Sequence, residues 1–204
     1  MKTVSCMNID RELLSQYGAE NKQYLKDELI FREDDYALYY FQIITGKVKL
    51  NNYNDEGREF IHNILGENQS FGDSVVFFDR KYSMNAIALT PSEILQLPKH
   101  NFMDLLKDHP EVSLEMNRCL AQKLYFKSIM MQHLTSLNPT LKIKGILDYL
   151  KSYHQNEEQF SYPVEITRQQ LANLTGLRVE TVIRTLKKMQ KENMLRIDNK
   201  KIMY

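Results

Sequence analysis

Glycine and proline are distributed unevenly along the chain, and this distribution constrains the fold more than any other feature. Four of the seven glycines lie within 27 residues, at Gly46, Gly57, Gly66 and Gly72. By contrast, residues 111–137 contain neither glycine nor proline. Short runs interrupted by glycine are typical of antiparallel strands joined by tight turns, whereas a long stretch without either residue favours a helix. The sequence therefore predicts a β domain followed by a long helix.

The β domain is expected within residues 25–98, as a small antiparallel barrel or roll. Its strands should be short runs in which apolar and aromatic residues alternate with polar ones. The segment 54–57 ends in glycine and suits a hairpin loop, because glycine tolerates the positive φ that tight turns need. The predicted strands are residues 38–44, 47–50, 59–65 and 92–97.

The predicted helix, from Pro110 to about residue 137, carries an apolar row with the alternating spacing of a coiled coil. It would be about 42 Å long, which is more than a small barrel needs for its own packing. Two interpretations are open: the helix packs on its own barrel, or it forms the seam of a homodimer, which the length favours. The residues of the predicted seam are Leu120, Leu124, Lys127, Met131 and Leu134.

Asn138 and Pro139 mark the start of a new helix. Asparagine is a good N-cap, and proline is well tolerated at the first helical position. The junction between the two helices is a candidate hinge. We therefore predict three parts, over residues 1–109, 110–138 and 139–204.

Residues 164–204 have the pattern of a winged helix-turn-helix. Thr167 and Gln170 have capping-box spacing at the start of one helix, and Gly176 fits the tight turn after it. A second helix is expected over 178–191. Two short runs around residues 198–200 then predict a β-hairpin wing. The residues expected to face the interior are Leu171, Ala172, Leu174, Val182, Leu186 and Met189.

The formal net charge of +1 conceals an asymmetry between the two parts of the chain. Residues 1–138 carry 15 basic and 19 acidic residues, whereas 139–204 carry 12 and 7. The resulting charges are −4 and +5, and a basic end indicates a nucleic-acid or membrane-facing surface. A solvated helix face is the alternative explanation. Because the basic residues coincide with the predicted helix-turn-helix, we favour double-stranded DNA as the partner.

The second helix of such a motif enters the major groove. Arginine can bind guanine O6 and N7 in a bidentate manner, and glutamate can accept from cytosine N4. We expect base contacts from Glu180, Arg184, Arg178 and Thr181. Phosphate contacts, which set the salt-dependent share of affinity, are expected from Thr167, Arg168, Gln169, Lys187, Lys188, Lys200 and Lys201.

Residues 166–172 and 175–184 resemble the DNA-binding segment of the CRP/FNR family, and the resemblance covers nearly the whole chain. Residues 44–50, 55–59 and 70–73 are similar to successive segments of that family's cyclic-nucleotide-binding-like β-roll. The resemblance implies an α+β chain with three parts: a sensor domain with an antiparallel roll over 1–109, a dimerisation helix and hinge over 110–138, and a winged helix-turn-helix DNA-binding domain over 139–204. It also implies a homodimeric, cytoplasmic bacterial transcription regulator that binds pseudo-palindromes and contacts RNA polymerase.

In that family, a glutamate and an arginine four residues apart are associated with a TGA half-site, and Glu180 and Arg184 match them. Val179 resembles the FNR branch more than the cyclic AMP receptor branch. Ile183 departs from both branches.

The resemblance also implies where an effector would bind. Nucleotide-binding members have a Gly-Glu pair for the ribose and an Arg-Ser pair for the cyclic phosphate. Gly72-Asp73 matches the first pair conservatively, but the second falls on Tyr82-Ser83, which lacks the arginine. This argues against cyclic AMP, since a buried phosphodiester without a guanidinium loses its best partner. The pocket candidates are Phe71, Gly72, Asp73, Ser74, Arg80, Tyr82, Ser83, Lys127 and Ser128.

Other cofactors find little support in the sequence. Cys6 and Cys119 are too few for a disulfide framework or for the four-cysteine iron–sulfur cluster of the oxygen-sensing branch. No metal site is predicted. Haem stays open because the chain has histidines at positions 62, 100, 109, 133 and 154. The effector itself is not identified, and a ligand-independent protein is a further possibility.

We considered three classes of function. An enzyme is disfavoured because the sequence has no Walker A loop, Rossmann fingerprint or His-Glu-x-x-His motif. A ligand-independent architectural DNA-binding protein would use the same winged helix, and a cyclic-nucleotide-responsive regulator would use the same roll. The sequence, which has no long apolar run or signal peptide, favours a soluble cytoplasmic transcription regulator with no membrane partner.

Overall fold

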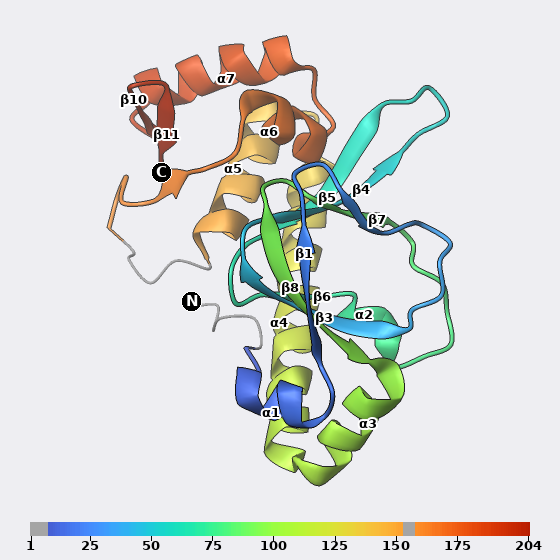
Figure 1. Cartoon of the computed structure of the whole chain (residues 1–204). Helices are drawn as coiled ribbons and strands as arrows, with labels where there is room; N and C mark the ends of the chain where they lie inside the picture. The colour runs from blue at the N-terminus through green and yellow to red at the C-terminus, as the bar shows by residue number, and fades with distance from the viewer. Residues whose placement is uncertain (1–7, 153–157) are drawn as a thin grey trace. The chain divides into compact units, whose positions relative to one another are not determined.

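The computed structural model describes residues 8–152 and 158–204, which form two compact units (Figure 1). One unit comprises the described residues up to Ala121, and the other begins at Gln122. The division between them lies within the long helix α4 (Pro110–Leu134). The predicted domain boundaries at 109/110 and 138/139 stay a prediction.

The first unit is a β-roll of two four-stranded antiparallel sheets with short helices around it. The strand orders are β1-β8-β3-β6 and β2-β7-β4-β5. The strands are β1 (Glu20–Tyr24), β2 (Leu29–Phe31), β3 (Tyr39–Thr45), β4 (Val48–Tyr53), β5 (Glu59–Leu65), β6 (Ser70–Phe71), β7 (Asn85–Ala88) and β8 (Ser92–Pro98). The helices are α1 (Arg11–Gln16), α2 (Asp73–Val76) and α3 (Lys99–Asp108).

The predicted strands and hairpin are confirmed. The four predicted runs correspond to β3, β4, β5 and β8, and β4 pairs with β5 from Val48 opposite Leu65 to Tyr53 opposite Glu59. In the connecting loop, the Gly57 amide donates to the Asn54 carbonyl at 2.8 Å, with Gly57 at φ +73°. Strands β1, β2, β6 and β7 were not predicted, because they are short or largely polar.

Aromatic side chains fill the interior of the roll. Phe41 stacks on Phe71 with ring centroids 4.9 Å apart, and Phe31 stacks on Tyr82 at 3.7 Å. All four are buried, together with Ile43 and other aliphatic side chains of both sheets. Such close packing is the main source of stability for a domain of this size.

Helix α4 ends at Leu134, three residues before the predicted end. Met116 and Cys119 are its buried residues. On another face, an exposed row follows heptad spacing, because every third or fourth residue in turn lies on one side of a helix. This row consists of Leu114, Asn117, Ala121, Leu124, Ser128 and Met131. Of the predicted seam, Leu124, Lys127 and Met131 are exposed, whereas Leu120 and Leu134 are half-buried.

The second unit contains the end of α4 from Gln122, the helices α5, α6 and α7, and a small sheet with the order β10-β11-β9 (Figure 1). Helix α5 (Pro139–Lys151) begins as predicted, since the Asn138 side chain accepts from the Thr140 amide at 3.0 Å and Pro139 occupies the first helical position. The other elements are β9 (Pro163–Val164), α6 (Arg168–Thr175), α7 (Val179–Lys191), β10 (Arg196–Asp198) and β11 (Lys201–Met203).

Strands β10 and β11 form the predicted wing, with Asp198 opposite Lys201. Strand β9 joins them and was not predicted, because two residues carry no periodic signal. The order of antiparallel roll, long helix and winged helix-turn-helix therefore confirms the predicted α+β fold class.

Candidate nucleic-acid interface and ligand pocket

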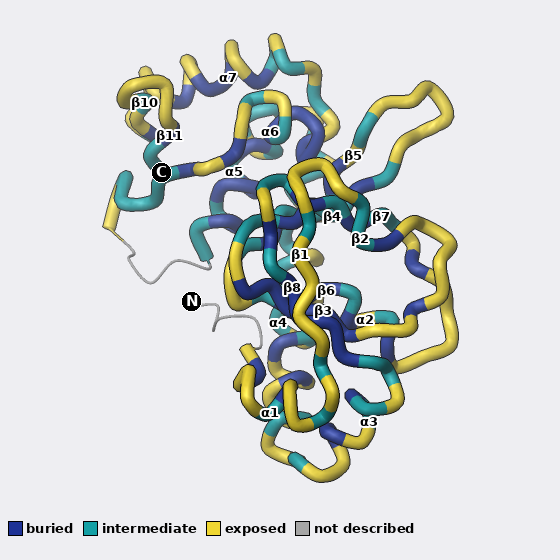
Figure 2. The backbone as a smooth tube through the Cα atoms, viewed as in Figure 1, coloured by how far each residue is buried: buried dark blue, intermediate teal, exposed yellow. Residues whose placement is uncertain are grey.

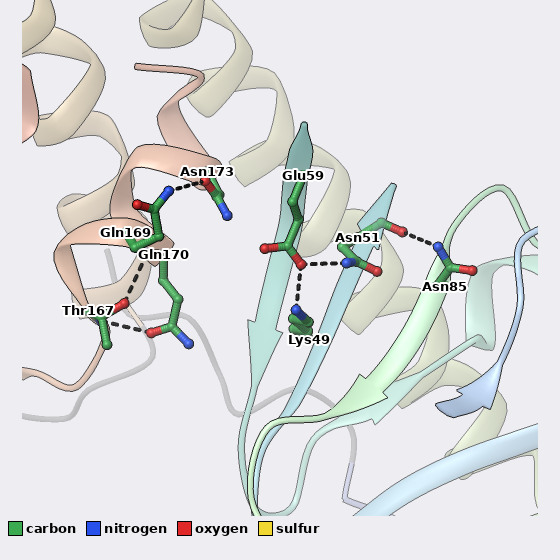
Figure 3. Close-up of polar contacts among 8 residues, drawn as sticks. All are labelled: Lys49, Asn51, Glu59, Asn85, Thr167, Gln169, Gln170 and Asn173. Carbon is green, nitrogen blue, oxygen red and sulfur yellow. Dashed lines mark hydrogen bonds and ion pairs between the residues drawn. The ribbon is translucent and has the colours of Figure 1, made fainter. Parts of the chain in front are cut away.

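A capping box fixes the start of α6. The Thr167 hydroxyl accepts from the Gln170 amide at 3.1 Å, and the Thr167 amide donates to the Gln170 side-chain oxygen at 2.8 Å (Figure 3). The helix ends at Gly176, whose φ of +69° is readily adopted by glycine. This local chemistry, expected from the sequence, fixes both ends of α6 and directs the chain into α7.

One face of α7 is buried and the opposite face is exposed. Val182, Leu186 and Met189 are buried, as predicted, and Thr185 is buried with them. In Figure 2 the tube along α7 accordingly alternates between buried and exposed colour. The periodicity of 3.6 residues leaves the polar residues of this helix on the other side.

The exposed face of α7 carries most of the predicted base-contacting groups. Glu180, Arg184 and Arg178 are exposed, and Thr181 is half-buried. Among the residues that the structure describes, the side chains of Glu180 and Arg184 have no hydrogen-bond or ion-pair partner. Arg178 is the N-cap of the helix but makes no side-chain capping bond. The charged groups needed for base contacts are thus available on this face.

A shallow hollow runs along this face, and its lining contains two residues that were not among the predicted contacts. Ile183 is an exposed apolar side chain among charged ones, and Lys191 extends the positive charge by one turn. Both residues line the hollow together with Arg184 and Lys187. A helical projection of residues 178–191 could have predicted them from the sequence. The lining residues are Glu180, Ile183, Arg184, Lys187, Lys188 and Lys191.

The residues predicted to contact phosphate are not equivalent in the structure. Lys187, Lys188, Lys200 and Lys201 are exposed, the last two in the turn and strand of the wing. Lys188 lies 3.8 Å from the Glu192 carboxylate. Three further candidates lie at the start of α6: Thr167 uses its hydroxyl in the capping box, Gln169 donates to the Asn173 side-chain oxygen at 2.9 Å, and Arg168 is half-buried.

In the roll, the structure brings together only some of the predicted pocket residues. Phe71, Asp73 and Tyr82 are buried, and a Cβ at Gly72 would lie 3.2 Å from the Phe41 ring and 3.4 Å from Tyr82. Ser74, Arg80 and Ser83 are exposed. Lys127 and Ser128 are exposed on the part of α4 that belongs to the other unit.

Tyr82, the residue at which the resemblance predicted the pattern's arginine to be replaced, belongs to the aromatic core. Its side chain is buried, and its hydroxyl donates to the Tyr39 carbonyl at 3.4 Å. Burial raises the pKa of the Tyr82 phenol far above its ordinary value, so the group is neutral. Asp73 accepts from the Ser70 hydroxyl at 2.7 Å within the same region. Neither residue supplies a positive charge.

A polar cluster on β4, β5 and β7 was not expected from the sequence. The Glu59 carboxylate accepts from the Lys49 ammonium and from the Asn51 side-chain amide, each at 2.5 Å (Figure 3). Asn85 donates to the Asn51 carbonyl at 3.2 Å. These side chains lie on paired strands, and single polar residues in a strand give no sequence signal for such a cluster.

The described residues contain no group of three or more histidine, cysteine or acidic side chains placed to hold a metal ion. Cys119 is a buried thiol on α4, whereas Cys6 and His154 lie outside the described residues. His62 lies 2.5 Å from the Asn52 side chain, and His109 lies 3.0 Å from Glu111. No helix in the described part of the chain is long and apolar enough to cross a membrane.

Comparisons with known proteins match both the β-roll and the helix-turn-helix of this chain. A model of the cyclic nucleotide-binding domain matches residues 21–109, and a model of the Crp-like helix-turn-helix domain matches residues 145–203. The fold is also similar to that of the c-di-GMP-responsive global regulator CLP of Xanthomonas campestris. That structure has a TM-score of 0.74 and 21% identity, and the match covers 95% of this chain and 98% of that one.

Two relatives extend the similarity over most of the sequence. The cAMP-activated global transcriptional regulator CRP of Haemophilus influenzae is 29% identical over 175 residues, covering 83% of this chain and 76% of that protein. The global nitrogen regulator of Synechocystis is 28% identical over 189 residues, covering 87% and 80%. These relatives are regulators of transcription rather than enzymes. With both domain models matched in order along one chain, this protein belongs to the CRP/FNR family of transcription regulators.

Proposed function

We propose that this regulator binds a TGA-containing pseudo-palindrome as a homodimer and reads each half-site with α7. The observation that carries the proposal is the position of Glu180 and Arg184, which are exposed on the face of α7 opposite its buried core and have no partner among the described residues. They are four positions apart in the sequence, so both side chains project from the same side of the helix. An arginine can bind a guanine and a glutamate can accept from a cytosine of the same site.

The basic side chains around this pair support binding to the DNA backbone. Two exposed lysines, Lys187 and Lys191, lie on α7 itself. Two more, Lys200 and Lys201, are exposed in the wing. Phosphate contacts position a protein on the duplex and make its affinity depend on salt. We assign these four lysines to phosphate and reserve base contacts for α7.

Homodimerisation is supported by the exposed heptad row of α4. Leu124 and Met131 are 72% and 65% exposed, and Leu114 is exposed on the same row. A second copy of the helix would remove these side chains from water, which is favourable. We therefore place the dimer seam on the row that contains Leu114, Ala121, Leu124, Ser128 and Met131, which shares Leu124 and Met131 with the predicted seam.

We infer that the effector of this protein is not cyclic AMP, even though several relatives are cAMP-activated. Tyr82 stands where the phosphate-binding arginine is expected and stacks on Phe31 within the core. Arg80 is the nearest arginine in the sequence and is exposed. We propose that this regulator responds to a different small molecule or acts without one. We also propose that it contacts RNA polymerase, as its family does.

Selection of binding sites from random duplexes, followed by titration of the Arg184→Ala variant, tests the DNA-binding proposal. We expect a TGA-centred palindrome and a loss of about 1–3 kcal/mol for the variant on that site. Arg11→Ala, on exposed α1 of the roll, is the matched control and should bind as the unsubstituted protein does. An architectural protein would instead select deformable sequences without a TGA core, and the variant would lose affinity for scrambled duplexes to the same extent.

Two further measurements test the remaining parts. Native mass spectrometry at micromolar concentration should give a dimer, and Leu124→Glu should give a monomer. A monomer without the substitution would contradict the proposed dimer seam.

Calorimetry should detect no cyclic AMP binding in the micromolar range, and binding there would overturn the inference about the effector.

A further inference from the structure

Ile183 is an apolar side chain exposed on a charged face. It is 43% exposed, and the other residues that line the hollow of α7 are all charged. An isoleucine that leaves this much of its side chain in water gains only part of the free energy of burial, and it is less favourable in a helix than arginine, lysine, glutamine or glutamate. The charged residues around Ile183 therefore indicate what kind of partner would cover it.

The place of Ile183 within the helix narrows the choice of partner. It is the fifth residue of α7, in the half of the helix that contacts base edges in helix-turn-helix proteins. Glu180 precedes it by three residues and Lys187 follows it by four, so the three side chains lie on one face. A group that meets Ile183 also lies beside the charges of Glu180 and Lys187.

We propose that Ile183 contacts the C5-methyl group of a thymine and thereby selects thymine at one position of each half-site. The thymine methyl is the apolar group that a base pair presents in the major groove. The surrounding Arg184, Lys187, Lys188 and Lys191 complement a polyanion, which favours DNA over an apolar protein surface. This inference rests on the proposed function, since α7 must lie in the major groove.

The test replaces each thymine of the selected site, one at a time, with deoxyuridine, which lacks only the methyl group. We expect one position per half-site at which the substitution weakens binding about four-fold, the value for burial of one methyl group. Ile183→Ala should bind the thymine and deoxyuridine duplexes equally. Ile183→Val, which keeps the branch at Cβ, should retain part of the discrimination.

Leu141→Ala provides a matched control, because Leu141 is 41% exposed on α5 and lies outside the recognition face. It should keep the full preference for thymine. Thermal unfolding of each variant verifies that the domain is intact, which is expected because both side chains are exposed.

Three outcomes overturn the proposal. Deoxyuridine has no effect at any position, or Ile183→Ala keeps the same preference for thymine, or Leu141→Ala abolishes it as well. Each of these leaves TGA-selective binding in place, and the first is the result expected if Ile183 instead anchors an acidic protein. If no duplex is selected over a scrambled one, the proposed function fails first, and that result is distinct from the other three.

Discussion

The interior of the roll and the outer face of α7 use their side chains in opposite ways. In the roll, Phe71 and Tyr82 are 1% and 4% exposed and their rings stack on other core residues. On α7, the Glu180 and Arg184 side chains are exposed and have no partner in the described chain. Groups that already contact the protein stabilise the fold, whereas groups left in water are available to a ligand. Phe71 and Tyr82 therefore pack the core, whereas Glu180 and Arg184 remain free for the DNA recognition that we propose.

The largest expected effect tests the roll side of this comparison. Phe71→Ala should reduce the free energy of unfolding of the roll by about 3–5 kcal/mol, because it removes a buried ring and leaves a cavity. Hydrogen–deuterium exchange of β3 and β8 measures the change. Phe78→Ala, an exposed phenylalanine of the same unit, is the control and should cost well below this. A loss for Phe71→Ala as small as that of the control would mean that the ring lines a pocket rather than the core.

A second prediction concerns the buried side of the DNA-binding unit. Gly145 lies in the interior of α5, where alanine is normally more stable than glycine by about 1 kcal/mol. A Cβ at this position, however, would lie 2.6 Å from the Cβ of His133. We therefore expect Gly145→Ala to destabilise the unit by about 1–3 kcal/mol, the usual cost of overpacking. A destabilising effect, where glycine to alanine in a helix normally stabilises, is therefore the result that identifies the close contact with His133.

Gly66→Ala is the control for that substitution, because a Cβ there would meet nothing within 4 Å and its backbone needs no positive φ. It should leave the melting temperature nearly unchanged. A stabilising effect of Gly145→Ala would show that α4 and α5 separate easily at this contact.

The sequence allowed more of the helix-turn-helix to be predicted than of the roll. Capping and turn residues act locally, so Thr167, Gln170 and Gly176 were sufficient to predict α6 and its end. The buried face of α7 was predicted correctly because its apolar residues recur with the helical period of 3.6 residues. In the roll, strands with alternating burial were predicted, but β1 has no buried residue and gives no such pattern.

The predicted pocket in the roll shows which contacts cannot be predicted from local sequence patterns. Motif spacing located Gly72 and Tyr82, and the missing arginine was apparent from the sequence. Tyr82 precedes β7 and Phe31 ends β2, so their stacking joins segments that are distant in sequence, and no local pattern encodes such a contact. The exposed row of α4 was only partly predicted, because a helix with apolar residues on several sides admits more than one heptad register.

A third prediction separates a structural role of Thr167 from a role in DNA binding. Thr167→Ala removes the hydroxyl that accepts from the Gln170 amide and should cost about 1 kcal/mol of stability in the absence of DNA. Thr167→Ser keeps the capping oxygen and should restore most of it. Thermal unfolding of the free protein gives the comparison. If both variants are as stable as the unsubstituted protein and only DNA binding weakens, the hydroxyl serves phosphate rather than the cap.

The smallest expected effect on stability belongs to Lys187, and it tests the recognition side of the comparison. Because Lys187 is exposed, Lys187→Ala should change the free energy of unfolding by no more than about 0.5 kcal/mol. Its effect should appear instead in the salt dependence of DNA binding, where the slope of log K against log salt should fall by about one for each protomer. Lys26→Ala, on the roll, should leave the slope unchanged. An unchanged slope for Lys187→Ala would remove this lysine from the phosphate contacts and shift the electrostatic share of affinity to the wing, where Lys200 and Lys201 provide the next substitutions to measure.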